Sequence, residues 1–215
     1  MDWQELADLP YAALLEPHDG ALSAGDSYDT AHFDHLTVTG ADGSASRFLE
    51  CAITHVRFDG GYLRHARFTD VWLRDVRMTA TSLAQSSWTG SVITNSALSG
   101  VEAYGASLGD VVLQGCKLDS VSFRGATLTG VVFTNCELRD VDFTGAALTR
   151  TSFPGCTLAA VNLTKVRLDS VDLRGAELGL IVDPPALRGA IVTPAQLAAL
   201  APLLADSLGI KVADS

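Results

Sequence analysis

The sequence lacks the features that mark most membrane proteins, secreted proteins and enzymes. It has no run of 18 apolar residues, which argues against a membrane-spanning helix. Its first ten residues, MDWQELADLP, contain neither the basic stretch nor the apolar stretch of a secretory signal peptide. We therefore expect a cytoplasmic protein. The GxSxG, HExxH, GxGxxG and P-loop motifs are also missing, so we expect no enzyme, no catalytic residue and no cofactor.

Cysteine is scarce and follows no recognised pattern. The four cysteines, at 51, 116, 136 and 156, have neither a CxxC spacing nor the arrangement of a disulfide scaffold. All four numbers end in 1 or 6. Cys116, Cys136 and Cys156 recur every 20 residues, but the outer two would lie about 9.6 Å apart, too far to share one zinc ion. We expect all four to be buried, reduced thiols.

Basic residues are absent from the first 45 positions, which contain nine acids and no Lys or Arg. The stretch 46–180 has thirteen acids and thirteen bases, and the last 35 residues have three acids and two bases. The net charge of −10 is therefore a property of the N-terminal segment. Direct nucleic-acid binding needs more positive charge and exposed aromatic side chains, so we expect neither a nucleic acid nor a membrane as partner.

A repeat of five residues runs without interruption from Ser46 to Leu180. Every residue whose number ends in 3 or 8, from Phe48 to Leu178, is apolar, and only Ala103 among them is small. The residue two places earlier is small or β-branched in nearly every repeat. Neither a helix nor a simple strand has a period of five, so this pattern predicts a solenoid.

The repeats ATLTG at 126–130, VDFTG at 141–145 and VDLRG at 171–175 resemble the pentapeptide-repeat family. The resemblance covers at least 27 consecutive pentapeptides, and a weaker extension begins at Ala31. It implies an all-β fold, a right-handed quadrilateral parallel β-helix in which four pentapeptides form one coil of 20 residues. The central and minus-two residues of each repeat would point inward.

Two properties of the residues support this fold independently of the resemblance. Positions whose numbers end in 0 or 5 are rich in Gly, Asn and Asp, which tolerate the positive φ that tight corners require. Residues 20 apart would stack at about 4.8 Å, and sorting the chain by 20 gives uniform inward columns. One of these columns is Val101, Val121, Val141 and Val161.

We expect three segments: an acidic N-terminal capping segment at 1–30, the β-helix at 31–180, and a partial coil with a capping helix at 181–215. In the first segment, Asp8-Leu9-Pro10 would begin a short helix. In the last, Leu187 and Val192 would form a partial turn in a register shifted by one residue.

The C-terminal helix has clear start and stop signals. Thr193 and Pro194 suit the N-cap and first helical positions, and Gly209 suits the position just past the end. Pro202 is expected to kink or split the helix. The helix would cover the exposed edge of the last coil.

Two apolar surfaces are candidate interfaces. The first is an outward stripe at spacing 20, covered by the N-terminal segment with Trp3, Leu6 and Leu9, by a second subunit, or by an unrelated partner. Its residues are Trp72, Val92, Val112 and Val132. The second surface is one face of the C-terminal helix, a candidate contact in an end-to-end homodimer. Its residues are Leu197, Leu200, Leu204 and Leu208.

Two polar features complete the candidates. The early repeats contain a candidate basic patch, which we expect to pair with the acidic residues 1–45 in a salt-sensitive way. Its residues are Arg47, Arg57, Arg64, Arg67, Arg74 and Arg77. His35, His55 and Asp75 fall in one outward corner column, but ordinary surface polarity explains such a column equally well. We therefore expect no metal site.

Two functions fit the sequence. The first is a non-enzymatic interaction or structural module with a protein partner. The second follows from the resemblance, because some pentapeptide-repeat proteins imitate DNA, bind DNA gyrase or topoisomerase IV, and protect against quinolones. Such mimicry requires a strongly negative rod. The neutral charge of residues 46–180 therefore favours the interaction module.

Overall fold

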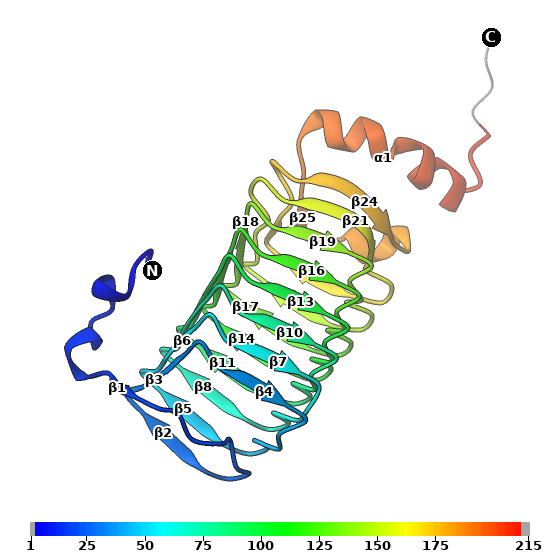
Figure 1. The fold of residues 1–215 in the computed structure, drawn as a ribbon. Helices are drawn as coiled ribbons and strands as arrows, with labels where there is room; N and C mark the ends of the chain where they lie inside the picture. Colours follow the sequence, from blue (N-terminus) through cyan, green and yellow to red (C-terminus); the bar gives the residue numbers. More distant parts are fainter. Residues whose placement is uncertain (1–2, 212–215) are drawn as a thin grey trace.

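The computed structural model describes residues 3–211 and shows one rod of stacked parallel strands with a helix, α1 (Pro194–Ser207), at its C-terminal end (Figure 1). Each coil takes 20 residues, and paired residues in adjacent coils are 20 apart, as with Val112 and Val132. The predicted all-β parallel solenoid is confirmed. No helix among residues 3–211 is long and apolar enough to cross a bilayer.

One coil defines the four faces of the rod. From residue 112 the chain passes through β15 (Val112–Gln114), β16 (Lys117–Asp119), an isolated bridge at Ser122 and β17 (Thr127–Thr129). We name the faces after these elements: the β15 face, the β16 face, the bridge face and the β17 face.

Three of the faces are hydrogen-bonded parallel sheets. The β15 face consists of β1 (Glu16–Pro17), β3 (Ala31–Asp34), β6 (Ala52–Thr54), β9 (Trp72–Arg74), β12 (Val92–Thr94), β15 and β18 (Val132–Thr134). The β16 face consists of β4 (Thr37–Thr39), β7 (Arg57–Asp59), β10 (Arg77–Thr79), β13 (Ala97–Ser99), β16, β19 (Glu137–Arg139), β21 (Thr157–Asn162) and β24 (Glu177–Ile181). The β17 face consists of β2 (Ser27–Asp29), β5 (Arg47–Leu49), β8 (Arg67–Thr69), β11 (Ser87–Thr89), β14 (Ser107–Gly109), β17, β20 (Ala147–Thr149) and β22 (Arg167–Asp169).

The corners and the interior of the rod are formed by the positions that the five-residue repeat predicts. Asn95 and Asp110, two of the predicted corner residues, have φ of 50° and 52°. Of the 27 central residues from Phe48 to Leu178, all are buried except Leu168 and Leu178, which are half-buried. Burial of each large side chain stabilises the fold by roughly 1.5–3 kcal/mol. The rod is thus held together mainly by its own inward columns.

Aromatic residues that are 20 apart in the sequence stack their rings along the rod axis. The ring of Phe68 lies 4.7 Å from that of Phe48 and 3.7 Å from that of Trp88, with nearly parallel planes. Phe123 stacks on Phe143 and Phe133 on Phe153 in the same way. Stacked columns of this kind fix the register, because a shift of one residue would turn these rings outward.

The register shortens by one residue in the last coil. Val161 pairs with Leu180, and β23 (Val171–Asp172) pairs with β25 (Ala190–Ile191), so paired residues are 19 apart there. Leu187 and Val192 pack against the core in this shifted register, as expected. The short helix η3 (Pro184–Leu187) connects the two pairings.

Helix α1 begins and ends where the sequence predicts. Thr193 accepts a hydrogen bond from Gln196 N, and Gln196 Oε1 accepts one from Thr193 N, which forms a capping box. Gly209 has φ of 69°, and Ile210 N donates to Ala205 O, as in a Schellman motif. Of the kink or split expected at Pro202, the split is wrong, because α1 is one helix through this residue.

The last coil is covered differently from the expectation. No residue of α1 is buried, and the apolar contacts with the core come from Ala186, Leu187, Ala190 and Val192. Gln196 Nε2 attaches the helix by donating to Leu173 O at 2.7 Å and Ala176 O at 2.8 Å. The helix therefore leaves Leu197, Leu203 and Leu208 exposed, while Leu200 and Leu204 stay half-buried.

The N-terminal residues also differ from the expectation. No helix begins at Asp8. Instead, two 3₁₀ turns, η1 (Leu6–Asp8) and η2 (Ala12–Leu14), flank Leu9 and Pro10. Pro10 has no N–H to donate, which interrupts a continuous helix. Residues 3–15 lie along the side of the rod, and β1 then joins the edge of the β15 face (Figure 1).

Candidate interaction surfaces

The outward apolar stripe on the β15 face is covered by the chain's own N-terminal strap, defined here as residues 3–15. Leu9 and Tyr11 of the strap form a buried cluster with Ala52, Trp72 and Val92. Trp72 is only 1% exposed as a result. Of the coverings considered, the structure shows the N-terminal segment, and Trp72 and Val92 are not available to a partner. Val112 is half-buried and packs against this cluster, and Val132 is half-buried one coil further along the rod.

The contact between strap and rod is mainly apolar, with one ion pair at its edge. The Tyr11 hydroxyl donates to Cys51 O at 3.4 Å, and burial raises the pKa of Tyr11 above its ordinary value. Arg74 Nη1 lies 2.7 Å from Glu5 Oε2 and donates to Gln4 O. The hydrogen bond to Glu5 raises the pKa of Arg74 and outweighs burial, which lowers it. This ion pair lies at the exposed edge of the contact between strap and rod.

The six arginines of the expected basic patch do not form one surface. Arg47 and Arg67 are paired on the β17 face, and Arg57 and Arg77 on the β16 face. Arg64 lies over the Tyr62 ring on the bridge face, while Arg74 belongs to the β15 face. A 20-residue coil sends sequence neighbours to different faces, so the expectation of one patch is wrong. Within residues 3–211, only Arg74 among the six has an ion pair with an acid of the first 45 residues.

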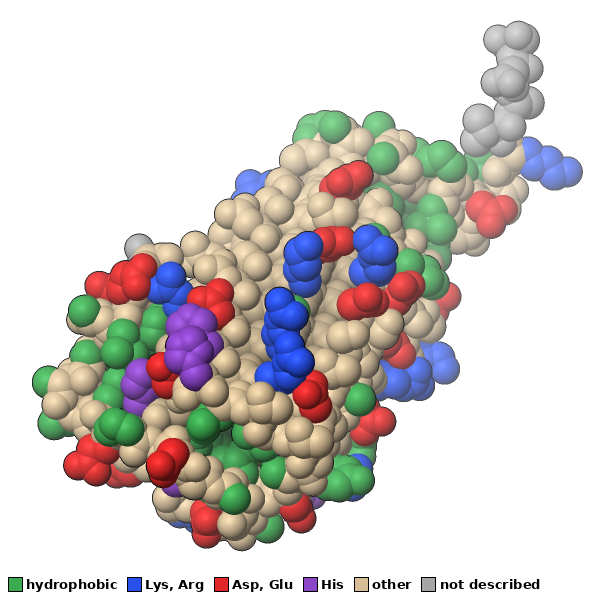
Figure 2. Space-filling model, viewed as in Figure 1, with side chains coloured by type: hydrophobic (Ala, Val, Ile, Leu, Met, Phe, Trp, Pro, Cys, Tyr) green, Lys and Arg blue, Asp and Glu red, His purple; other side chains and the backbone are tan. Residues whose placement is uncertain are grey.

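No face of the rod is strongly acidic. We assign each corner to the face that precedes it and count residues 31–180. The β15 face then has three acids and two bases, the β16 face five and four, the bridge face three and three, and the β17 face four and four. Figure 2 shows the two signs interleaved on the visible side of the rod. The near-neutral count of the repeat does not conceal a one-sided acidic surface.

Helix α1 presents the most concentrated exposed apolar surface of the described residues. Leu197 is 51% exposed and Leu208, at its C-cap, is 75% exposed. Leu200 and Leu204 are half-buried. Figure 2 shows hydrophobic side chains along this helix. Exposed apolar residues clustered in this way mark interaction sites.

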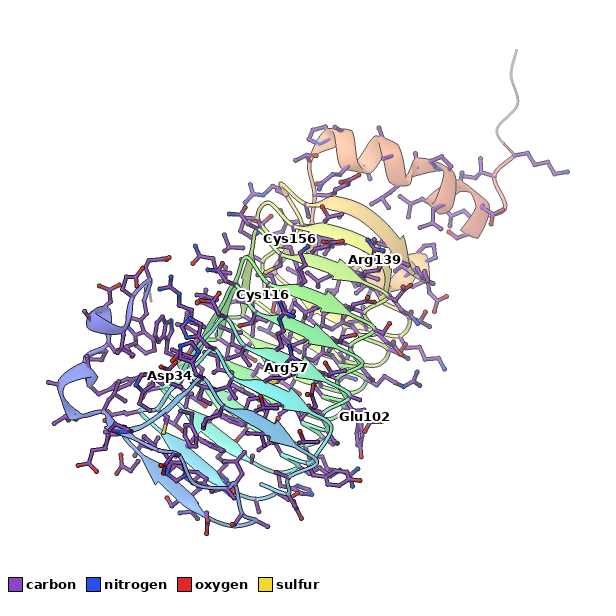
Figure 3. The ribbon with its side chains drawn as sticks, viewed as in Figure 1. Asp34, Arg57, Glu102, Cys116, Arg139 and Cys156 are labelled. Carbon is purple, nitrogen blue, oxygen red and sulfur yellow. The ribbon has the colours of Figure 1, made fainter. Side chains whose placement is uncertain are left out.

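The cysteine column lies inside the rod, where Figure 3 labels Cys116 and Cys156. The Sγ atoms of Cys116, Cys136 and Cys156 each donate to a backbone carbonyl of the preceding coil, at 3.3–3.4 Å. The hydrogen bond to Cys116, together with burial, raises the pKa of Cys136 to about 12. Cys136 is therefore a poor nucleophile and a poor metal ligand at neutral pH, whereas the same hydrogen bond lowers the pKa of the buried Cys116.

The histidine column is formed as expected, and the structure adds a residue that the sequence did not indicate. The rings of His35 and His55 stack, with centroids 4.4 Å apart. Asp34, one residue before the corner, lies against both rings at the N-terminal end of the β15 face (Figure 3). Grouping residues that are 20 apart in the sequence brought together only His35, His55 and Asp75, because Asp34 belongs to a neighbouring column.

Comparison with known proteins identifies the repeat. A family model for the pentapeptide repeat region matches residues 86–163. No curated protein matches the chain. Among solved structures, HetL, a pentapeptide repeat protein involved in heterocyst differentiation regulation from the cyanobacterium Nostoc sp. strain PCC 7120, is 19% identical. That match covers 86% of this chain and 95% of HetL, with a TM-score of 0.47.

A second solved structure with similarity is trypsin-treated QnrB1, a plasmid-mediated fluoroquinolone resistance protein. It is 20% identical, and the match covers 92% of this chain and 95% of that chain with a TM-score of 0.42. The pentapeptide repeat protein Rfr23 from the cyanobacterium Cyanothece 51142 is 22% identical over 47% of this chain and 64% of its own, with a TM-score of 0.28. The match to the family model shows that residues 86–163 are a pentapeptide repeat region, and coils with the same five-residue repeat continue on both sides of it.

Proposed function

We propose that the protein is a non-enzymatic interaction module that forms a homodimer through helix α1. The observation that carries this proposal is the exposure of the apolar side chains on α1, at the end of a rod whose own apolar columns are buried. Leu197, Leu200, Leu204 and Leu208 recur at helical spacing, so one side of the helix is available to a second copy. A two-fold axis would place the same side of α1 on both partners.

Neighbouring residues at the C-terminal end extend this apolar surface. Ile181 and Ile191, at the last strands, are also exposed. A helix of 14 residues is only about 21 Å long, and a stable dimer buries about 1,200–2,000 Å² in total. The proposed interface therefore includes the end of the rod beside α1, and the two rods meet end to end.

The mass of the protein in solution tests this proposal. Light scattering coupled to size exclusion is expected to give twice the mass of one chain for the wild type and the mass of a single chain for Leu197→Glu. Leu49→Glu is the matched control, because Leu49 is an exposed leucine on the β17 face, far from α1. A monomeric wild type, or a dimer that survives Leu197→Glu, would overturn the proposal.

The alternative function is binding of DNA gyrase or topoisomerase IV as a DNA mimic. The surface of these enzymes that binds DNA phosphates would require dense negative charge on a protein that imitates DNA. The almost balanced charges on all four faces do not favour this alternative. A supercoiling assay with gyrase, run with and without ciprofloxacin, tests it. We expect micromolar protein to leave both reactions unchanged, and protection against ciprofloxacin would establish the alternative.

A further inference from the structure

The corner that follows β3 brings three potential metal ligands together. His55 Nδ1 lies 3.1 Å from Asp34 Oδ1, and His35 Nε2 lies 3.8 Å from Asp34 Oδ2. One ligand atom from each of Asp34, His35 and His55 lies within 4.8 Å of the other two. We propose that these three residues bind one divalent transition-metal ion of the zinc type on the surface of the β15 face.

The solenoid fixes the positions of these ligands. His35 and His55 occupy the same corner of adjacent coils, with φ of 53° and 54°. The strands before these corners, β3 and β6, are paired in register, which fixes the spacing between the two backbones. Ligands on paired strands are more precisely placed than ligands on free loops.

Asp34 is held in place by a chain of polar contacts. Its Oδ1 accepts a hydrogen bond from Thr54 Oγ1 at 2.5 Å, and Thr54 Oγ1 lies 2.9 Å from His32 Nε2. These contacts orient the carboxylate before a metal arrives, as the partners of metal ligands usually do.

The fit requires only side-chain movement. Ligand atoms about 2.0–2.2 Å from a tetrahedral zinc ion lie about 3.3 Å from one another. One pair is already in contact at 3.1 Å, and each remaining pair must close by about 1.5 Å or less. The side chains of His35 and His55 are 72% and 48% exposed, so both rings can rotate toward a shared ion.

A fourth residue, the acidic Asp75, completes the arrangement from the next coil. Asp75 Oδ2 lies 3.7 Å from His55 Nε2, the ring nitrogen opposite the one that faces Asp34. When Nδ1 of His55 binds the metal, Nε2 carries the proton and can donate it to Asp75. This carboxylate–histidine–metal order is common in metal sites because it fixes the tautomer of the ligand.

The donor atoms select the class of metal. Imidazole nitrogen with carboxylate oxygen suits zinc, nickel and related ions, whereas calcium and magnesium prefer oxygen ligands alone. The neighbouring cation, Arg74, already contacts Glu5 and Asp75, which reduces its repulsion of an incoming ion. We therefore expect zinc to bind and magnesium not to bind.

Isothermal titration of the metal-free full-length protein with zinc chloride tests the proposal. We expect one zinc ion per chain, and an affinity reduced at least about tenfold in His35→Gln, His55→Gln and Asp34→Asn. His65→Gln is the matched control, since His65 is also exposed and at a corner, with φ of 58°, but lies on the bridge face. It should bind as the wild type does, and magnesium chloride should produce no binding heat.

Proton NMR of the wild type gives a second readout that does not depend on a variant that folds. Zinc should shift or broaden the imidazole signals of His35 and His55 while the signals of His65 stay unchanged. The proposal would be overturned if the wild type bound no zinc, or if His35→Gln and His55→Gln bound zinc as tightly as the wild type. It would also be overturned if His65→Gln lost as much zinc affinity as these two variants.

Discussion

Ala103 is the only small residue among the central positions of the repeat, and it lines an internal apolar cavity of about 30 Å³. The next residues of its column, Leu83 and Phe123, are large and line the same cavity. The Ala103→Leu substitution would fill this space with apolar atoms in the geometry that the column already accepts. We expect the free energy of unfolding to rise by about 1 kcal/mol.

Chemical denaturation measures this change, and Ala146→Leu provides the matched control. Ala146 is fully buried and does not line this cavity, so the added atoms would overpack the interior and lower stability by about 1–3 kcal/mol. Equal destabilisation by both substitutions would contradict the expected filling of the cavity beside Ala103.

Asp142 is expected to make the stability of the fold decrease as the pH becomes acidic. Burial raises its pKa, but hydrogen bonds from Thr144 N, Thr144 Oγ1 and Arg124 Nη1 outweigh burial and hold the pKa below its ordinary value. A carboxylate with a lowered folded-state pKa stabilises the protein fully above the unfolded pKa of about 3.9, and this contribution is lost as pH falls through the folded pKa.

We therefore expect the midpoint of thermal unfolding to fall as the pH drops below about 4, and to fall less steeply in Asp142→Asn. Asp34 and Asp172 also have lowered pKa values, so the variant should flatten the profile only in part. A pH profile that is identical in wild type and variant would contradict this account.

At the scale of elements, the N-terminal strap is held by apolar packing more than by charge. Tyr11 is buried against Trp72, whereas Glu5 meets Arg74 at an exposed edge. We expect Tyr11→Ala to lower the free energy of unfolding by about 3 kcal/mol, as for other buried aromatic residues. Glu5→Gln should change it by less than about 1 kcal/mol, because exposed ion pairs contribute little.

Tryptophan fluorescence and denaturation at low and high salt separate the two contributions. Tyr11→Ala should shift the emission to longer wavelength as Trp72 becomes exposed, with little dependence on salt. A strong salt dependence in the wild type, removed by Glu5→Gln, would instead support the electrostatic pairing expected from the acidic N-terminal sequence.

The sequence predicts most of the rod because each repeat specifies its own coil. Phe48, Phe68 and Trp88 fall in one column by counting alone, and corner residues such as Asp110 are recognised by type. The strap could not be predicted in the same way, since contacts such as Tyr11 with Trp72 join a non-repetitive segment to a distant coil. The basic patch was misjudged because Arg64 and Arg67 are close in sequence but lie on different faces.

The 20-residue period of the coil assigns Arg64 and Arg67 to different faces from the sequence alone. The same period groups His35 with His55, yet it could not show that Asp34 turns toward them. Orientation of that carboxylate depends on its contacts with Thr54 and His55, which are tertiary.

At the scale of the whole molecule, the repeat forms a rod with nearly balanced charge, and helix α1 at its C-terminal end exposes apolar side chains. Hydrogen-bonded sheets run along three faces of the described coils. Recognition through α1 would join two rods at their C-terminal ends and leave the faces of each rod uncovered, apart from the part of the β15 face beneath the strap. This arrangement is the central claim of the proposed function.

Small-angle X-ray scattering of the purified protein tests that claim most directly. The end-to-end dimer predicts a maximum dimension about twice that of the Leu197→Glu monomer, with twice the mass. A dimer with the same maximum dimension as the monomer, or a wild type that scatters as a single rod, would contradict it.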